Sequence, residues 1–211
     1  MSAILAIGAH PDDIEFGCFG LLHELMRLDP SRKVTCYVAT NGGLCGGRRA
    51  GSRLDETFKA LLFLPRAVNI VGGHYDMLDG ELDRKVKALT QDLDACIATY
   101  KPSLVLTHAP WDSHQDHRAL WTASQAACRR STITLLSYYS GSATEEFVPN
   151  VYQQLSPALL GKKIRALKEH KSQLNKPYFE MQWLHAWHRD TAGMLAGVQF
   201  VERFHLHRMF A

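Results

Sequence analysis

Short apolar runs alternate along the chain with longer segments in which apolar residues recur every three or four positions. Apolar runs of this length predict buried strands, and the recurring pattern predicts amphipathic helices. The predicted strands cover residues 4–9, 34–39, 68–71, 104–107 and 133–139, and the predicted helices cover residues 13–28, 53–64, 82–100, 117–129 and 159–173. Such alternation is typical of an α/β fold in which a parallel sheet carries helices on both faces.

The expected strand order is 3-2-1-4-5, an open arrangement in which the first and fourth strands are neighbours. In such sheets ligands bind in the crevice at the carboxyl ends of the strands, where the strand order reverses. The segments that follow the first and fourth strands are about a hundred residues apart in the sequence. The topology predicts that these two segments meet at the crevice.

Polar residues with metal-binding side chains follow the first strand directly, as His10-Pro11-Asp12-Asp13. Pro11 favours an extended backbone at His10 and also suits the first turn of a helix. The exposed amides of a helix N-terminus favour ionised carboxylates at Asp12 and Asp13. Because residues three apart share a helical face, His10 and Asp13 can converge on one ion, whereas Asp12 points elsewhere and is free to act.

A second polar cluster, His114-Gln115-Asp116-His117, follows the fourth strand and a turn. His117 can complete the ligand set while His114 stays off the metal. Asp116 could accept a proton from a ring nitrogen of either histidine and so fix its tautomer. Three protein ligands leave one position for water, which is typical of a catalytic rather than a structural zinc site.

Each cluster also has an ordinary structural interpretation. Taken alone, the first is a helix-capping turn and the second is a His-x-x-His pair on a solvated helix face. Their joint position at the carboxyl ends of strand runs favours a metal site. Zinc is the expected ion, although imidazole and carboxylate ligands also suit Fe²⁺ or another divalent cation.

The composition predicts one globular domain. With 211 residues, 46% of them hydrophobic and 21% charged, the chain is long enough for one substantial core and short for two. We expect residues 1–150 to form this core and residues 151–211 to be a C-terminal extension packed on it. Five cysteines without a CxxC pair favour reduced thiols in the cytoplasm over a disulfide framework. Neither a signal peptide nor a transmembrane segment is expected from the apolar runs.

Positive charge is concentrated in the C-terminal part. Residues 1–150 carry 15 Lys and Arg against 17 Asp and Glu, whereas residues 151–211 carry 9 against 4. A helical pattern of cations predicts a solvated helix face and, as a weaker hypothesis, attraction of an anionic substrate: Lys162, Lys163, Arg165, Lys168 and Lys171. No aromatic-interleaved basic stripe indicates nucleic-acid binding. Core or surface positions without a ligand role are expected for His185, His188, His205 and His207.

Three further features lie near the expected crevice. The glycine-rich segment 40–47 matches no nucleotide-binding pattern and predicts a flexible loop at the rim. Arg53 and Glu56, three apart at a helix start, predict either a surface ion pair or a substrate role. Asp76 follows the third strand and should also face the crevice.

Together these features resemble the PIG-L and LmbE superfamily of metal-dependent N-acetylglucosaminyl deacetylases. The resemblance rests on Ala-His-Pro-Asp-Asp and His-x-Asp-His, with weaker matches at Thr-Asn-Gly, Arg53-x-x-Glu56, Asp76 and Glu202-Arg203-Phe204. It implies a Rossmann-like fold without a dinucleotide. It also implies zinc-dependent removal of the acetyl group from an N-acetylated amino sugar, which releases acetate and a free amine.

The resemblance assigns catalytic roles to individual side chains. By this likeness His10, Asp13 and His117 match the metal ligands, and Asp12 matches the general base. His114 matches the residue that stabilises the oxyanion, and its protonated form is expected to do so.

The resemblance also implies how the substrate is bound. Arg53 and Asp76 match positions that contact the sugar. The sequence leaves open whether the amino sugar is free or linked to a nucleotide, a lipid or another aglycone, and whether the chain forms a homo-oligomer. The chain differs from many members of the superfamily at Phe19, Gly43 and Gln115.

Two other functions stay open on the residues alone. In a two-metal phosphoesterase, Asp12, His114 and Asp116 would hold a second ion. A non-catalytic sugar-binding module would leave Asp12 and His114 without a role, which argues against it.

Overall fold

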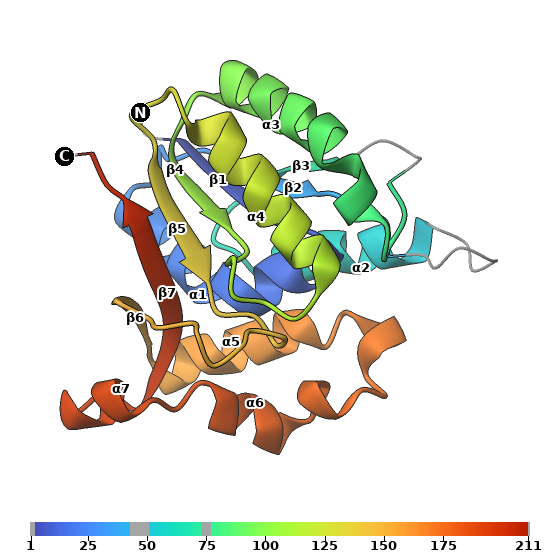
Figure 1. Cartoon of the computed structure of the whole chain (residues 1–211). Helices are drawn as coiled ribbons and strands as arrows, with labels where there is room; N and C mark the ends of the chain where they lie inside the picture. Colours follow the sequence, from blue (N-terminus) through green and yellow to red (C-terminus); the bar gives the residue numbers. More distant parts are fainter. Residues whose placement is uncertain (1–2, 43–50, 73–76, 211) are drawn as a thin grey trace.

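A mixed sheet organises the chain, which a computed structural model describes for residues 3–42, 51–72 and 77–210 (Figure 1). Its strands are β1 (Ala3–Gly8), β2 (Val34–Val38), β3 (Asn69–Gly72), β4 (Pro102–Thr107), β5 (Thr134–Tyr138), β6 (Val151–Leu155) and β7 (Phe200–Arg208). They lie in the order β3-β2-β1-β4-β5-β7-β6. Strands β1 to β5 run parallel, and β7 runs antiparallel to both β5 and β6. The predicted order 3-2-1-4-5 is confirmed, and β7 and β6 extend the sheet beyond it.

Helices cover both faces of this sheet. They are α1 (Asp13–Leu28), α2 (Gly51–Leu61), α3 (Val86–Tyr100), α4 (Gln115–Cys128), α5 (Pro157–Leu167), α6 (Met181–Trp187) and α7 (Thr191–Leu195), with 3-10 turns η1 (Leu82–Lys85), η2 (Lys171–Gln173) and η3 (Pro177–Phe179). Helices α3 and α4 pack on one face, whereas α1, α2 and α5 pack on the other (Figure 1). None of the helices within the described residues has both the length and the apolar character that a bilayer span requires.

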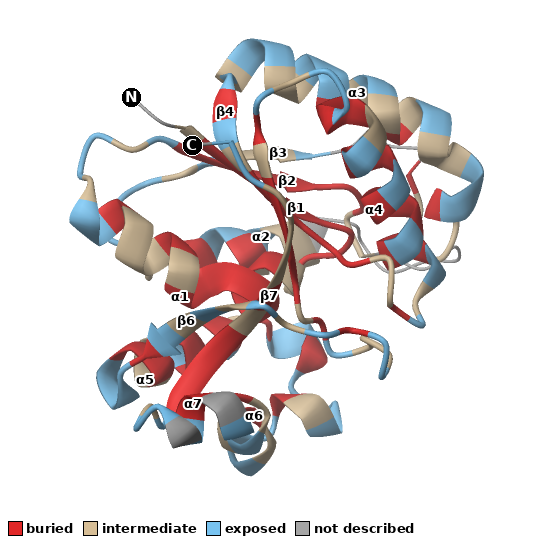
Figure 2. Ribbon diagram, turned by 60° about the vertical axis from the view of Figure 1, so that its left-hand side comes forward, coloured by how far each residue is buried: buried red, intermediate tan, exposed pale blue. Residues whose placement is uncertain are grey.

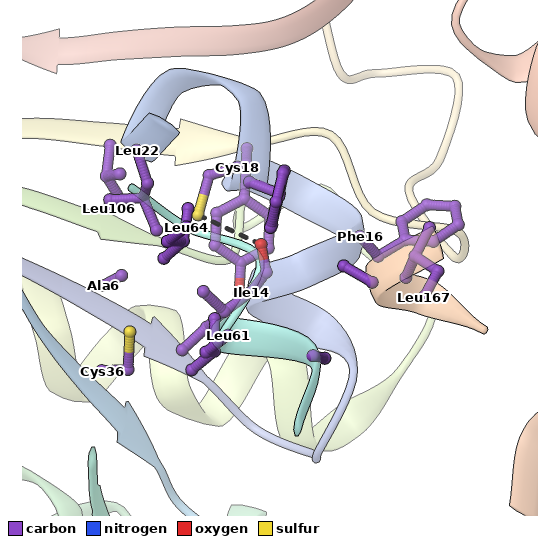
Figure 3. Close-up of a cluster of buried hydrophobic side chains, with 14 of the residues drawn as sticks. Ala6, Ile14, Phe16, Cys18, Leu22, Cys36, Leu61, Leu64, Leu106 and Leu167 are labelled. Carbon is purple, nitrogen blue, oxygen red and sulfur yellow. Dashed lines mark hydrogen bonds between the residues drawn. The ribbon is translucent and has the colours of Figure 1, made fainter. Parts of the chain in front are cut away.

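Strand β1 is buried on both faces, which explains its uninterrupted apolar run (Figure 2). Ile4 and Ala6 join the apolar cluster under α1, α2 and α5, part of which is drawn in Figure 3. Leu5 and Ile7 join the cluster under α3 and α4. Apolar residues at every position are typical of a central strand in a parallel sheet, where helices cover both faces. This packing fixes the carboxyl end of β1 and therefore the residues that follow it.

The C-terminal part is built into the same sheet as the rest of the chain. Helix α5 packs against α1, and β7 pairs with β5 (Figure 1). Strands β6 and β7 were not predicted from the sequence, because polar residues such as Gln153, Gln154 and Glu202 interrupt their apolar patterns. Of the four histidines expected to have no ligand role, His188 is buried, and His185, His205 and His207 are half-buried.

One prediction for the basic segment is wrong. Lys163 was expected on a solvated helix face, yet it is fully buried and its Nζ lies 2.7 Å from Oε1 of Glu202. Lys163 lies four residues after Leu159 and four before Leu167, which is the spacing of the apolar face of α5. The exposed cations of this segment are Arg165, Lys168 and Lys171.

Candidate metal centre

The two polar segments that follow β1 and β4 meet at the carboxyl edge of the sheet. His10 lies in the turn between the end of β1 and the start of α1 at Asp13. His117 lies in the first turn of α4. Because β1 and β4 are paired neighbours, the rings of His10 and His117 come within hydrogen-bonding distance across 107 residues of sequence.

Three side chains converge with the spacing that one ion requires. His10 Nδ1 lies 3.3 Å from His117 Nε2 and 3.4 Å from Asp13 Oδ2. His117 Nε2 lies 3.6 Å from Asp13 Oδ1. A tetrahedral ion about 2.0–2.2 Å from each donor atom separates its ligands by roughly 3.3–3.6 Å. The residues present therefore fit a divalent ion with two imidazole ligands and one carboxylate ligand.

His117 is held by Asp112, a residue that the sequence analysis does not single out. Asp112 Oδ2 lies 2.9 Å from His117 Nδ1, which leaves Nε2 to face the other two converging side chains. Asp112 also accepts hydrogen bonds from the backbone N–H of His114 and from the hydroxyls of Ser140 and Ser142. Although burial opposes ionisation, the hydrogen bond and charge of His117 hold the pKa of Asp112 well below its usual range. An ionised carboxylate in this position fixes the orientation and tautomer of the ring.

His10 is supported through its other ring nitrogen. His10 Nε2 lies 3.1 Å from Asp116 Oδ2 and 3.1 Å from Asp79 Oδ1. The buried Asp116 carboxylate also accepts the backbone N–H groups of Gly80 and Leu82, at 2.6 and 3.0 Å. The structure thus places Asp116 behind one of the two converging histidines. Asp79 was missed, because its segment has no periodic pattern that ties it to the crevice.

A further histidine, His108, contacts Asp13 and was also missed. It follows β4 directly and is fully buried, and its Nε2 lies 3.0 Å from Asp13 Oδ2. Its ring stacks on the ring of His117, with the ring centres 3.7 Å apart. Burial, together with the charge of His117, lowers the pKa of His108 to about 4. The sequence did hold a signal for His108, because it directly follows a strand run and residues at such positions face the crevice.

Asp12 stands apart from the three converging side chains. Its φ of 115° is a conformation that L residues rarely adopt, and it lies at the N-terminal cap of α1. Among the described residues, the groups of donor atoms close enough to share an ion do not include its carboxylate. Burial and the negative charge of Asp13 raise the pKa of Asp12 to about 6. A carboxylate with this pKa can exchange a proton close to neutral pH.

Arg53 holds the turn that contains Asp12. Its guanidinium donates to the backbone carbonyl of Pro11 at 2.9 Å, and its Nη2 lies 3.5 Å from Asp12 Oδ2. Glu56, the alternative partner suggested by spacing, accepts hydrogen bonds from the backbone N–H and hydroxyl of Ser172. Arg53 therefore faces the crevice side of α2, beside the candidate base.

His114 caps helix α4 with its ring. Its Nδ1 accepts the backbone N–H of Asp116 at 3.2 Å, so the proton of the neutral ring sits on Nε2. Burial, followed by the charges of His117 and His10, lowers the pKa of His114. In its neutral form the ring presents an Nε2–H donor, whereas the protonated form expected from the resemblance could not accept the N–H of Asp116 at Nδ1.

The converging side chains open onto a cavity of about 290 Å³. Its size is near the lower end of the range for small-molecule sites. Besides the ionisable groups already described, its lining includes residues that follow β5 and residues of the C-terminal part: Ser140, Gly141, Ser142, Lys176, Tyr178 and Phe179. The predicted substrate contact Asp76 lies outside the described residues, as does most of the glycine-rich segment 40–47.

Two sequence comparisons agree on the relatives of this chain. A family model described as PIG-L, GlcNAc-PI de-N-acetylase, matches residues 5–128, which include both polar segments. A curated relative from Escherichia coli (strain K12), named uncharacterized deacetylase YaiS, is 33% identical over 174 residues. That alignment covers 80% of this chain and 90% of the relative.

Solved structures show that the fold serves more than one reaction. An N,N′-diacetylchitobiose deacetylase from Pyrococcus horikoshii matches with a TM-score of 0.72 and 22% identity, over 97% of this chain and 83% of that chain. A 4-carboxy-2-hydroxymuconate hydratase, GalB, from Pseudomonas putida KT2440 matches with a TM-score of 0.76 and 14% identity, over 100% and 98% of the two chains. Since a deacetylase and a hydratase share this architecture, the reaction has to be argued from the residues of the site.

Proposed function

We propose that this chain, which belongs to the PIG-L family of GlcNAc-PI de-N-acetylases and is an N-deacetylase, hydrolyses the acetamide of a GlcNAc-type amino sugar at a divalent metal ion. His10, Asp13 and His117 would hold the ion. The observation that carries the proposal is the spacing of their donor atoms, 3.3–3.6 Å, beside a cavity that Asp12 also lines.

Zinc is the ion that we infer for this site. Two imidazoles and one carboxylate are a common ligand set of catalytic zinc, and Fe²⁺ accepts the same donors. When bound, such an ion supplies Lewis acidity and lowers the pKa of a water molecule to about 7. The carboxylates of Asp112 and Asp116 support this inference, because ligand histidines usually donate their second N–H to a carboxylate.

Asp12 is the residue that we assign to proton transfer. It lines the cavity next to the ligand set without belonging to it. Its carboxylate would accept a proton from the attacking water and return it to the nitrogen of the departing amine, so that acetate and a free amino sugar leave. A positioned acid–base group of this kind contributes about 10²–10⁴ to the rate.

His114 is the residue that we assign to the carbonyl oxygen of the acetamide. As water adds to the carbonyl carbon, negative charge develops on this oxygen, and the Nε2–H of His114 would donate a hydrogen bond to it. The backbone N–H of Asp116 supports the assignment, because its hydrogen bond to Nδ1 keeps the proton on Nε2. A neutral ring can make this hydrogen bond without first gaining a proton.

Substrate recognition is assigned to the walls of the cavity. We expect a GlcNAc-type ring to occupy it, and a nucleotide, lipid or other aglycone would extend beyond it. Arg53 lines the cavity and is proposed as a sugar contact, and Asp76 stays a prediction from the sequence. The rings of Tyr178 and Phe179 would pack against the apolar face of the sugar.

The two-metal phosphoesterase is a weaker candidate for this site. His10, Asp79, His114 and Asp116 also bring donor atoms close together. However, both oxygens of Asp116 already accept hydrogen bonds from backbone N–H groups, those of Gly80 and Leu82, so little of this carboxylate is left for a second ion.

We also propose a cytoplasmic location. This location suits the free thiols of Cys18, Cys36, Cys96 and Cys128.

Acetate release tests the proposed function. The zinc-loaded chain would be incubated with a panel of N-acetylglucosamine derivatives that are free, nucleotide-linked, lipid-linked or attached to another sugar, with Asp12→Asn as the matched control. We expect acetate from at least one derivative with the wild-type chain and a large reduction with the control. Release of phosphate from phosphoesters without acetate from any derivative would contradict the proposal.

A further inference from the structure

Helix α1 is broken in the middle, and the break lies between the metal centre and the rest of the helix. Cys18 has φ −145° and ψ 16°, which are not helical values. In an unbroken α-helix the N–H of Gly20 would donate to the carbonyl of Phe16, four residues earlier. Cys18 lies between these two residues, and side chains from the C-terminal part contact both of these backbone groups inside the protein.

A single buried ion pair satisfies both groups. Glu202 accepts the N–H of Gly20 at 2.7 Å through Oε1 and the N–H of Leu21 at 2.8 Å through Oε2. Lys163 donates to the carbonyl of Phe16 at 2.6 Å and lies 2.7 Å from Glu202. The exposed fractions of the two side chains are 0% and 1%. The pair therefore bridges the two backbone groups on either side of the kink.

The charges of the pair match the two halves of the helix. The carboxylate of Glu202 lies at the N-terminus of the second half, and the ammonium of Lys163 lies at the C-terminus of the first half. Each charge lies at the helix end that attracts it. An ion pair this deeply buried gives little net stability compared with apolar residues, because both charges lose their hydration. Its geometry is better explained by the bend that it holds.

The first half of α1 depends on such external contacts. It covers residues 13–17, little more than one turn, and a helix this short is not stable alone. Along its side, Glu15 lies 3.1 Å from the buried His170. A Cβ at Gly17 would come within 2.2 Å of the ring of Tyr138, so the sheet also lies close beneath it. The position of this half is set by β5 and by the C-terminal part.

We propose that Lys163 and Glu202 are positioning residues for the metal centre, because the half-helix that they hold carries Asp13 and follows Asp12. This inference rests on the proposed metal-binding function. Metal ligands must be placed to within about 0.2 Å, so a small shift of this half-helix weakens the ion's coordination. Both residues lie in the C-terminal part, beyond residues 5–128 that the family model matches.

The test compares a neutral pair with an unrelated destabilising change. In the double variant Lys163→Met with Glu202→Gln, no unpaired charge is left in the core. Leu93→Ala is the control, because Leu93 lies in α3 on the opposite face of the sheet. For each folded protein we would measure the Zn²⁺ dissociation constant by competition with a chelator, the melting temperature, and kcat and KM separately.

The expected result is a Zn²⁺ affinity about 10–100 times weaker in the double variant, with a lower kcat and little change in KM. Leu93→Ala should lower the melting temperature and bind Zn²⁺ as the wild type does. Glu202→Asp alone, which keeps the charge of the pair but shortens the reach of the carboxylate to Gly20 and Leu21, should fold even if the double variant does not and should give a smaller loss of affinity. Wild-type Zn²⁺ affinity in the folded double variant or in folded Glu202→Asp would overturn the inference. Failure of the wild-type chain to bind Zn²⁺ would overturn the proposed function as well.

Discussion

Two groups of buried charge lie along helix α1, and they are organised in opposite ways. At the N-terminal end, Asp13 Oδ2 faces the backbone N–H of His10 at 2.7 Å, His10 Nδ1 at 3.4 Å and His108 Nε2 at 3.0 Å, beside a cavity. At the kink, Lys163 and Glu202 have matched backbone partners and are closed to solvent. The group around Asp13 is crowded and borders a cavity, whereas the Lys163–Glu202 pair has hydrogen-bond partners and is closed to solvent.

The difference shows that buried charge alone does not mark a functional site. At the kink the two charges contact each other and the backbone groups on either side of the break. At the N-terminal end two imidazole nitrogens, His10 Nδ1 and His117 Nε2, face each other at 3.3 Å with a carboxylate beside them. A cation between them would satisfy all three, which is why this group is the one that we assign to catalysis.

Among these predictions, removing a metal ligand of the group that borders the cavity should have the largest effect on metal binding and acetate release. His117→Ala is expected to lose both the ion and acetate release, because two remaining ligands hold a catalytic ion poorly. Metal content of the purified variant after dialysis, together with the rate of acetate release, checks this. A variant that still retains one ion per chain would show that His117 is not a ligand.

Removing the free carboxylate should separate binding from turnover. Asp12→Asn is expected to keep the ion and to lower kcat by about 10²–10⁴, because the amide cannot accept the proton. Metal analysis and steady-state kinetics on the same preparation give both quantities. If Asp12→Asn lost as much metal as His117→Ala, Asp12 would act as a metal ligand and not only as the base.

Removing one partner of the Lys163–Glu202 pair should lower the free energy of unfolding. Lys163→Met leaves the buried Glu202 carboxylate unpaired, which costs about 3–5 kcal/mol of unfolding free energy. The double variant Lys163→Met with Glu202→Gln should cost less, because no charge is stranded. Urea unfolding of the two variants measures the difference, and equal losses would mean that the charges do not interact.

The smallest expected effect is a change of stability with pH at His170. Burial opposes its protonation, but the charges of Glu15, Asp12 and Glu56 outweigh burial, and the pKa of His170 is raised. A raised folded-state pKa stabilises the protein below the ordinary value of about 6.5, and this stabilisation is lost as the pH rises through the folded-state pKa. In urea unfolding, the stability difference between wild type and His170→Gln should therefore shrink as the pH rises above 6.5. A constant difference from pH 6 to 9 would contradict the assignment.

The meeting of His10 with His117 could be predicted, because it follows from strand order and from two motifs at strand ends. Strand order depends on a hydrophobic pattern that the sequence shows directly. The structure also brings Asp13 to the same point, since it lies three residues after His10. Short-range spacing and sheet topology were sufficient for this part of the site.

The supporting residues could not be predicted from the same signals. Asp112 reaches His117 through the path of a loop, which has no periodicity, whereas the strand-end position of His108 did offer a signal. Lys163 lay within a run of cations that suggested a solvated face, and its partner Glu202 belongs to a strand that the polar residues concealed. Spacing on the apolar face of α5 was the signal that would have shown that Lys163 is buried.

A crystal structure of the Zn²⁺-loaded chain, with the ion located by anomalous scattering, tests the central claim most directly. The account predicts one ion about 2.0–2.2 Å from His10 Nδ1, His117 Nε2 and an oxygen of Asp13, with the Asp12 carboxylate outside its coordination shell. An ion bound instead among Asp79, His114 and Asp116, with His117 unligated, would contradict it.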